Sequence, residues 1–273
     1  MPELPEVESV RRGLAQTVVG KTITEVEVRW PRIIQTDSME IFKKKLINQT
    51  IQEIKRRGKF LLIYLDKYVL ISHLRMEGKY FLKSELAPVD KHTHVIFGFN
   101  DKTELRYNDV RKFGRIQLVP IGEEYKTKSL MKLGPEPTAD QLFSSGMTEF
   151  LENKTKAIKT ILLDQTMVVG IGNIYADEIL FDAAIHPQRP GNSLSKSEVS
   201  TLRESIIHIM NEAVKFGGST IRTYHNMLGE DGTYQEYHQV YGKKDESCPN
   251  CQTTIEKIQL NGRGTHFCPH CQK

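Results

Sequence analysis

The first six residues, "MPELPE", combine a proline with two carboxylates in a way that could do chemistry. If Met1 is removed, Pro2 presents a secondary amine that can attack an aldehyde-level carbon and form a cationic iminium. An α-amino group has a pKa of about 8, against about 10.4 for lysine, so more of it is neutral at neutral pH. Glu3 would then give or take a proton, and Glu6 would lie near the positive end of a helix and anchor the terminus. The plainer interpretation is that these residues only begin a helix.

Four cysteines form a second chemical group, in two Cys-x-x-Cys pairs separated by sixteen residues. Two such thiolate pairs can complete a tetrahedral shell around one zinc ion and leave no position for water. Disulfides or idle thiols are the alternative, but a cytosolic chain keeps its thiols reduced. We therefore predict one structural zinc ion, with His266 and His270 as spare donors only. The expected ligands are Cys248, Cys251, Cys268 and Cys271.

Between the cysteine pairs, the stretch "LNGRGTHF" places Arg263 next to a glycine turn. A glycine-flanked arginine at the tip of a small hairpin would be exposed and stiffly held. It is either an ordinary surface residue or a phosphate contact made by a zinc-pinned hairpin.

A second glycine turn, "MVVGIGN", lies between two expected helices and ends at Asn173. Asparagine is a good N-cap, so its plainer role is to satisfy helix amides. Amides at a glycine turn and at a helix N-terminus also favour phosphate. Lys154, Lys156 and Lys159 precede the turn, and no GxxxxGK[ST] loop is present. The arrangement therefore favours a nucleic-acid backbone over a small nucleotide.

Helices and short strands must position these groups. Apolar residues from Val7 to Val18 recur at helical spacing and predict a helix that starts at Pro5 and stops at Gly20. The alternating stretch "TEVEVRW" predicts a half-buried strand, and a short helix follows. Seven further segments read as strands: "TIQEIKRR", "KFLLIYL", "VLISHLRM", "KYFLK", "THVIFGF", "TELRY" and "RIQLV". Strands at this spacing predict an antiparallel sandwich or barrel.

The pattern of the sequence changes at "LGPEPTAD", residues 133–140, where two prolines and a glycine interrupt any periodicity and mark a domain boundary. Helices are predicted near 139–152, 155–165, 173–183 and 195–215, and Ser195 and Glu198 have the spacing of a capping box. The expected fold class is α+β: an N-terminal helix with an antiparallel β-sandwich, then a helical domain with a C-terminal zinc ribbon. The expected domains are 1–133, 134–240 and 241–273.

The net charge is +4, with 38 basic against 34 acidic residues, which hints only weakly at a polyanionic partner. Locally, residues 43–59 carry seven basic side chains and one acidic. No apolar run approaches the ~20 residues that span a bilayer, and the acidic start does not resemble a secretory signal. We therefore expect a cytoplasmic protein that does not bind membranes.

Several segments together resemble one family over essentially the whole chain. They are "PELPEVE", "RRGKFL", "HLRMEG", "LRYNDVRKFG", "LGPEP", "LLDQTMVVGIGNIYADEILF", "GGST" and the closing cysteine pairs. In this order they resemble the bacterial formamidopyrimidine-DNA glycosylases, which are bifunctional glycosylases and AP lyases. The resemblance implies a monomeric repair enzyme that flips an oxidised purine, such as 8-oxoguanine or a formamidopyrimidine, out of duplex DNA. It also implies action on abasic sites and association with the bacterial nucleoid through DNA.

By position in these motifs, the resemblance also implies roles for single residues. Pro2 attacks the sugar C1′, the base leaves, and the Schiff base drives β- and δ-elimination. Glu3 resembles the acid/base partner and Glu6 a supporting carboxylate. Lys59 resembles a proton donor for β-elimination, and Arg263 resembles the donor for δ-elimination and a phosphate ligand.

The resemblance extends to DNA contacts. Met76, Arg111 and Phe113 match a trio that fills the gap left by the flipped base, where apolar groups replace stacking and a guanidinium bonds the orphaned cytosine. Met76 and Phe113 could instead be core residues. Asn173 resembles the phosphate-binding asparagine of a helix–two-turn–helix motif, and His92, Arg111 and Lys154 match further DNA-contacting positions. The stretch "GGSTIRTY", residues 217–224, resembles a lesion-capping loop.

Two rival functions stay open on the sequence. An endonuclease VIII-like glycosylase for oxidised pyrimidines would share the terminal proline, but it typically has glycine where this chain has Leu4 and lacks the trio at these positions. A non-enzymatic zinc-ribbon protein that binds nucleic acid is the other rival. The presence of Pro2, Glu3, Glu6 and Lys59 speaks against it.

Overall fold

A computed structural model describes the chain in two compact units. The described residues are 1–35, 38–219 and 232–273. The N-terminal unit is built on Met1–Pro2 and Glu6–Met131, and the C-terminal unit on Glu3–Pro5, Lys132–Ser219 and Thr233–Lys273. The three-part division of the sequence stays a prediction. Within the described ranges, no helix combines the length and hydropathy needed to cross a membrane.

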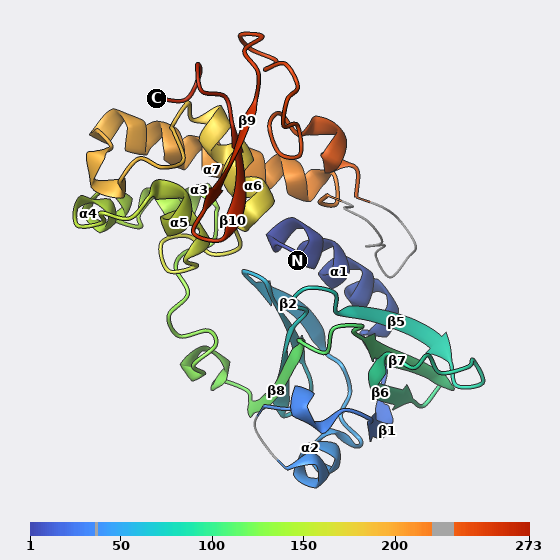
Figure 1. Cartoon of the computed structure of the whole chain (residues 1–273). Coiled ribbons are helices and arrows are strands. Elements are labelled where there is room, and N and C mark those ends of the chain that lie inside the picture. The colour runs from blue at the N-terminus through green and yellow to red at the C-terminus, as the bar shows by residue number, and fades with distance from the viewer. Residues whose placement is uncertain (36–37, 220–231) are drawn as a thin grey trace. The chain divides into compact units, whose positions relative to one another are not determined.

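Two four-stranded antiparallel sheets form the body of the N-terminal unit (Figure 1). Its strands are β1 Ile23–Val28, β2 Glu53–Arg57, β3 Phe60–Tyr64, β4 Tyr68–His73, β5 Lys79–Ser84, β6 Thr93–Phe99, β7 Thr103–Asn108 and β8 Arg115–Pro120. The strand orders are β1-β6-β7-β5 and β2-β3-β4-β8. The helices of this unit are α1 Leu4–Val18 and α2 Met39–Leu46, with short 3₁₀ turns η1 Pro31–Ile33 and η2 Glu124–Lys126. The predicted antiparallel sandwich and its N-terminal helix are confirmed.

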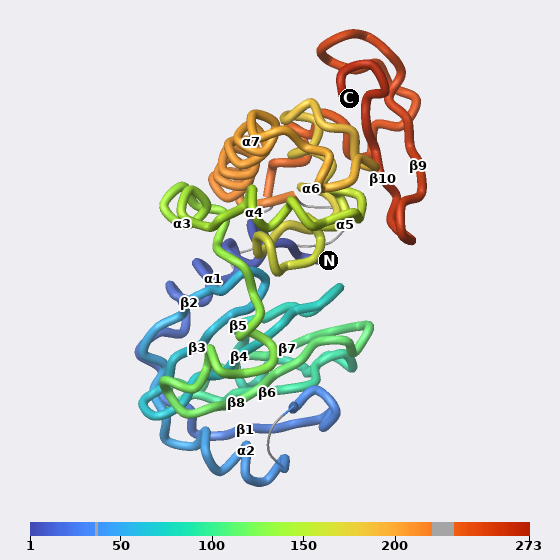
Figure 2. The backbone as a smooth tube through the Cα atoms, turned by 90° about the vertical axis from the view of Figure 1, so that its left-hand side faces the viewer, coloured from blue at the N-terminus to red at the C-terminus, as the bar shows by residue number. Residues whose placement is uncertain are grey.

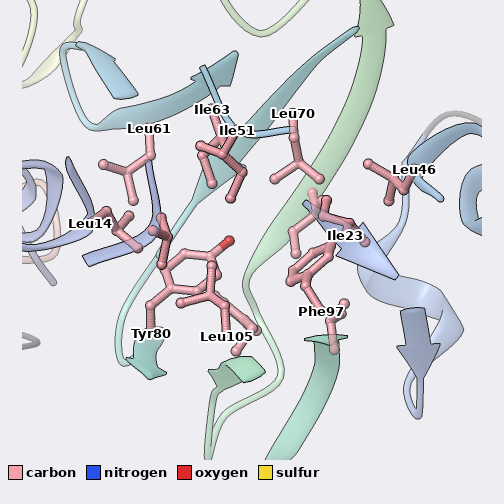
Figure 3. Close-up of a cluster of buried hydrophobic side chains, with 14 of the residues drawn as sticks. Leu14, Ile23, Leu46, Ile51, Leu61, Ile63, Leu70, Tyr80, Phe97 and Leu105 are labelled. Atoms are coloured by element: carbon pink, nitrogen blue, oxygen red, sulfur yellow. The ribbon is translucent and has the colours of Figure 1, made fainter. Parts of the chain in front are cut away.

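One hydrophobic core joins these layers. Figure 3 shows Leu14 of α1, Ile63 of β3 and Leu105 of β7 among the side chains that point into it. The predicted apolar face of α1, from Val7 to Val18, is buried there because its residues recur every three or four positions. Burial of such side chains is the main stabilising term, and it fixes the strand ends from which the functional loops leave.

Helices dominate the C-terminal unit. They are α3 Ala139–Phe143, α4 Met147–Glu152, α5 Ile158–Leu163, α6 Asn173–Asp182 and α7 Lys196–Lys215, with η3 Gly191–Ser193 and η4 Tyr234–Tyr237. The capping box that opens α7 is confirmed, since the Ser195 hydroxyl and the Glu198 carboxylate each accept the other's backbone N–H. The single helix predicted over 139–152 is wrong. Gly146 adopts a left-handed φ of +61° and separates α3 from α4.

The last strands form a small hairpin, β9 Glu256–Leu260 with β10 Arg263–Phe267. Figure 2 shows the two strands running side by side. The turn between them is the two-residue Asn261-Gly262, whose φ values of +47° and +74° are both positive. Asn-Gly suits this type I′ turn, whose twist matches the flanking strands.

Candidate active site and nucleic-acid interface

The carboxylate of Glu3 is fastened to the first turn of α6. Its Oε2 accepts hydrogen bonds from Gly172 N at 2.6 Å and Tyr175 N at 3.4 Å, and its Oε1 accepts one from Ile174 N at 2.9 Å. The residue before α6 is Gly172, which has no side chain to cap the helix. The positive end of the helix favours the negative charge. Glu3 is therefore oriented by the helix that begins with Asn173.

The glycine turn leaves room for the start of the chain. A β-carbon on Gly172 would lie 2.3 Å from Glu3 Cδ, and one on Gly170 would lie 2.4 Å from Leu4 Cδ1. The N–H of Leu4 also donates to Gly170 O at 3.0 Å. The prediction that this turn exposes its amides to phosphate is wrong for the amides of Gly172, Ile174 and Tyr175, because Glu3 accepts their hydrogen bonds.

The sequence suggested that Lys159 belongs to a basic surface, and this prediction is wrong. Lys159 is 1% exposed, and its ammonium forms an ion pair with Asp177 Oδ1 at 2.6 Å and donates to Gly264 O and Thr265 Oγ1. The other oxygen of Asp177 accepts from His266 N at 2.9 Å. Burial lowers the pKa of Lys159, and Asp177 opposes that shift. This network ties α5 and α6 to the β9–β10 hairpin.

Arg263 is exposed beside the tip of that hairpin, as expected. The turn residue Asn261 donates from Nδ2 to Thr160 Oγ1 at 2.7 Å, which pins the tip to α5. Asn173 donates from Nδ2 to Gly264 O at 3.0 Å, directly after Arg263. The C-terminal unit therefore brings Glu3, Asn173 and the hairpin with Arg263 together at the first turn of α6.

Lys154 lies apart from that turn, before α5. It is half-buried, and its ammonium sits 4.5 Å from the centroid of the Phe150 ring. Lys156 is exposed nearby. These two lysines border a cavity of about 260 Å³ that is also lined by Thr155 and Thr160. They remain available to a polyanion, unlike Lys159.

The four cysteines fit a tetrahedral metal. Their sulfur atoms all lie within 4.8 Å of one another. The Sγ atoms of Cys248 and Cys271 are 3.8 Å apart, and those of Cys251 and Cys268 are 3.5 Å apart. A zinc ion with Zn–S bonds of about 2.3 Å requires sulfurs about 3.8 Å apart, whereas a disulfide requires about 2 Å. The donor set therefore suits one structural zinc ion, and the N–H of Cys271 also points to the Cys268 sulfur at 3.4 Å.

The remaining predicted residues gather at one end of the N-terminal unit. The registers place there the pairs Phe60–His73, His73–Arg115, Lys79–Asn108 and Thr93–Asn108. Lys59 directly precedes β3, and the loops 74–78 and 109–114 pass from one sheet to the other. Met76, His92, Arg111 and Phe113 lie in the loops at this end.

Asp109 shapes the loop that presents Arg111 and Phe113. Its buried carboxylate accepts from Arg111 N at 3.0 Å, Phe113 N at 2.9 Å and Gly114 N at 2.8 Å. The Arg111 guanidinium lies 4.8 Å from the centroid of the Phe113 ring. Phe113 is 48% exposed, so the alternative that it is a core residue is wrong.

Tyr107 brings the loops of Met76 and Phe113 together. A β-carbon on Gly78 would lie 2.2 Å from the Tyr107 hydroxyl oxygen, and one on Gly114 would lie 1.8 Å from it. Both glycines therefore rest on the same buried ring. Met76, two residues before Gly78, is half-buried.

Lys59 and His92 flank these loops. Lys59 is 5% exposed, and its charge contributes to the lowered pKa of His73, which burial and Arg75 bring to about 3. The carbonyl of His92 accepts from Asp109 N at 3.0 Å. His92 is thus held against the loop of Arg111.

Glu8 of α1 lies at the same end of the N-terminal unit. Glu8 pairs with Arg56 at 3.2 Å, in the strand that leads to Lys59. Pro2 is buried, and Glu6 is 4% exposed.

Three carboxylates that position the site were missed in the sequence. Asp109 could have been found, because an aspartate before a tight loop often accepts the following amides. Asp177 and Glu178 carry no such signal. Glu178 accepts from the amides of residues 239–241 and has its pKa raised by burial.

The predicted lesion-capping loop at 217–224 falls largely outside the described residues. Its described part ends at Ser219, whose hydroxyl is 2.9 Å from His238 Nε2 and 3.2 Å from the Tyr175 hydroxyl.

Family models match three segments of the chain. The formamidopyrimidine-DNA glycosylase N-terminal domain matches residues 1–116, and the H2TH domain of formamidopyrimidine-DNA glycosylase matches residues 133–225. A zinc finger found in FPG and IleRS matches residues 242–273.

Full-length relatives agree with these models. The formamidopyrimidine-DNA glycosylase of Bacillus subtilis is 55% identical over 273 residues, which cover 100% of this chain and 99% of the relative. Two solved structures of the Lactococcus lactis Fpg protein, one with DNA that contains an abasic site and one with DNA that contains N7-benzyl-Fapy-dG, each have a TM-score of 0.94 and 47% identity. The matches cover 99% of both chains in the first case and 100% in the second.

Proposed function

The chain belongs to the formamidopyrimidine-DNA glycosylase family, and from this premise we propose that it removes oxidised purines from duplex DNA and cleaves the strand at the resulting abasic site. The observation that best supports a catalytic chain is the Glu3 carboxylate, which is held by three amides of the α6 region directly after Pro2. That arrangement fixes an acid/base group next to a candidate nucleophile.

Pro2 is the proposed nucleophile. Its free amine bonds to the sugar C1′ while the bond to the base breaks and the leaving purine takes the electron pair. Ring opening then gives an iminium, which draws electrons from the sugar so that C2′ loses a proton and the 3′ phosphate leaves. In a second elimination C4′ loses a proton and the 5′ phosphate leaves, after which water hydrolyses the iminium and frees the Pro2 amine. Glu3 moves protons at the sugar, and Glu6 supports the terminus.

Two cationic residues are proposed to serve the eliminations. Lys59 lies at the sheet end in the N-terminal unit and donates a proton in β-elimination. Arg263 extends from the hairpin in the C-terminal unit, binds a phosphate and serves δ-elimination. The zinc ion held by the four cysteines supplies no step in this chemistry, because four thiolates leave it no open position. It holds the hairpin.

The remaining residues are proposed to bind DNA. Asn173 and Lys154 contact phosphates, and His92 contributes a further backbone contact. Met76 and Phe113 fill the space of the flipped base, since a thioether and a ring replace lost stacking. Arg111 bonds the orphaned cytosine. We also propose that the protein acts as a cytoplasmic monomer that reaches the nucleoid through DNA.

A strand-cleavage assay tests this function. A duplex with one 8-oxoguanine opposite cytosine should be cut at the lesion, and a duplex with an oxidised pyrimidine should be cut less. A preference for the oxidised pyrimidine would favour an endonuclease VIII-like activity. Binding without any cleavage, by a chain shown to lack Met1, would favour a non-enzymatic protein.

A further inference from the structure

Trp30, the only tryptophan of the chain, is contacted by two cations. The Lys112 ammonium is 4.3 Å from its ring centroid, and the Arg32 guanidinium is 5.6 Å away. The indole ring is the best π partner for a cation. The two cations come from different places, because Arg32 lies in η1 next to Trp30, whereas Lys112 lies in the loop 109–114.

Lys112 has an unfavourable backbone conformation in that loop. It lies between Arg111 and Phe113 and has a φ of +59°, in the left-handed region that residues other than glycine rarely adopt. The Asp109 carboxylate holds the amides on both sides of Lys112. The Lys112 side chain contacts the Trp30 ring, and a side chain held in this way opposes relaxation of φ to an ordinary value.

One buried residue, His94, contacts both the backbone at Trp30 and the start of the loop. The amides of Arg29 and Trp30 both donate to His94 O, at 2.9 and 3.4 Å. The ring Nε2 of His94 lies 2.8 Å from Asp109 O, at the start of the loop. The indole and the loop therefore share one buried support.

We propose that Trp30 is a positioning residue that sets discrimination between bases opposite the lesion. Its indole holds Lys112 and thereby fixes the backbone from which Arg111 and Phe113 extend. This inference rests on the proposed function, in which Arg111 reads the orphaned base. A cation–π contact at an exposed site corresponds to a change of about two- to five-fold in an equilibrium or rate ratio.

The test measures kcat/KM on two duplexes, with 8-oxoguanine opposite cytosine or opposite adenine. The ratio of the two values cancels general attraction to DNA. Trp30→Leu and Lys112→Met should each lower the cytosine-to-adenine ratio about two- to five-fold, with Trp30→Phe between them and the wild type. The double variant should fall no further than either single one, because both remove the same contact.

Arg32→Met is the matched control. It removes the other cation from the same ring but leaves the loop contact, so the ratio should not change. An equal fall with Arg32→Met, or an unchanged ratio with Lys112→Met, would overturn the proposal. Lys112 and Arg32 are both exposed, so we expect Lys112→Met and Arg32→Met to fold. These two variants therefore test the proposal even if Trp30→Leu fails to fold.

The result with the wild-type chain distinguishes a failure of the proposed function from a failure of the proposed role of Trp30. If it cuts neither duplex, the proposed function fails. If it cuts both equally, the roles of Arg111 and Trp30 are wrong while the repair activity stands. If it prefers cytosine, and the cytosine-to-adenine ratio is unchanged in both Trp30→Leu and Lys112→Met, only the role of Trp30 is wrong.

Discussion

The proposed role of Pro2 depends on one covalent condition, because the nitrogen is an inert amide until Met1 is removed. We predict that borohydride traps a covalent adduct between the processed chain and DNA with an abasic site, and that peptide mapping places it on Pro2. Pro2→Gly keeps a terminal amine and should retain some lyase activity. Acetylation of the terminus should abolish trapping.

Lys59 is the competing amine in this experiment. A lysine with an ordinary pKa must lose a proton before it can attack, which costs more than for an α-amino group. An adduct mapped to Lys59, or full trapping by protein that still carries Met1, would refute the role of Pro2.

A single methyl group at Gly172 should disturb Glu3. The φ of Gly172 is −125°, which any residue adopts, so Gly172→Ala adds a steric clash with Glu3 without backbone strain. We expect excision of 8-oxoguanine to fall by an order of magnitude or more, and far more than cleavage of a preformed abasic site, with the same pattern in Glu3→Gln. Equal losses on both substrates would show that Glu3 does not serve base removal.

His238 makes stability depend on pH. Burial, and then the charge of Lys243, lowers its pKa from the ordinary 6.5 to about 4. Between these values the unfolded chain binds a proton that the folded chain does not, so the free energy of unfolding falls as pH drops from about 6.5 to 4. The loss is at most about 3.5 kcal/mol, at about 1.4 kcal/mol for each unit of pKa.

Urea unfolding across this pH range measures the effect. His238→Gln should flatten the dependence, whereas His208→Gln, on the exposed surface of α7, should not. An unchanged slope with His238→Gln would place the acid sensitivity elsewhere, for example at His73.

Residue types and their spacing over a few positions singled out the cysteines as zinc ligands, and Pro2 and Glu3 as catalytic candidates that the predicted experiments test. The partners of Glu3 were not visible. Its hydrogen-bond partner Gly172 is 169 positions away, and a carboxylate near a terminus looks the same whether or not a distant helix receives it.

Among the elements, the β9–β10 hairpin next to the four cysteines should lose its structure without zinc. We predict one zinc per chain by elemental analysis, lost in Cys248→Ser or after chelation. DNA binding should fall with it, because Arg263 and the contact from Asn173 to Gly264 depend on the hairpin. His270→Ala should keep the zinc. A metal-free protein that binds DNA normally would rule out this structural role.

Helix boundaries and buried charges were the hardest features to predict from the sequence. The break at Gly146 was hidden by helical spacing on both sides of it. Lys159 looked like one more basic surface residue because its partner Asp177 lies on another helix. Only packing of α5 against α6 decides which lysine of a basic run becomes buried.

For the whole molecule, DNA affinity should fall with salt, since each phosphate contact releases counterions and contributes about −0.9 to the log–log slope. Lys154→Ala should reduce the magnitude of the slope by about that amount. Asn173→Ala should weaken binding with little change of slope, because it is neutral. Both should affect damaged and undamaged duplex alike, and a loss confined to damaged DNA would move them to the base pocket.

The sandwich could be predicted from the spacing of many short strand-like segments along the chain, which needs only local sequence. The order β1-β6-β7-β5 could not, because it depends on which buried faces meet. That pairing of distant strands is also what gathers Lys59, Met76, His92 and Arg111 at one end.

The fastening of Glu3 and Leu4 has a consequence for conformational entropy. A lysine nucleophile must freeze a long side chain to react, at a cost of about 1.5–2 kcal/mol, whereas proline has almost no rotamer freedom to lose. The freedom of the Pro2 amine is that of the backbone, and the next two residues are already hydrogen-bonded to Gly170, Gly172 and Ile174. For the proposed Pro2 nucleophile, folding therefore supplies the ordering in advance, and we expect a rate advantage of roughly ten- to thirty-fold over a mobile lysine.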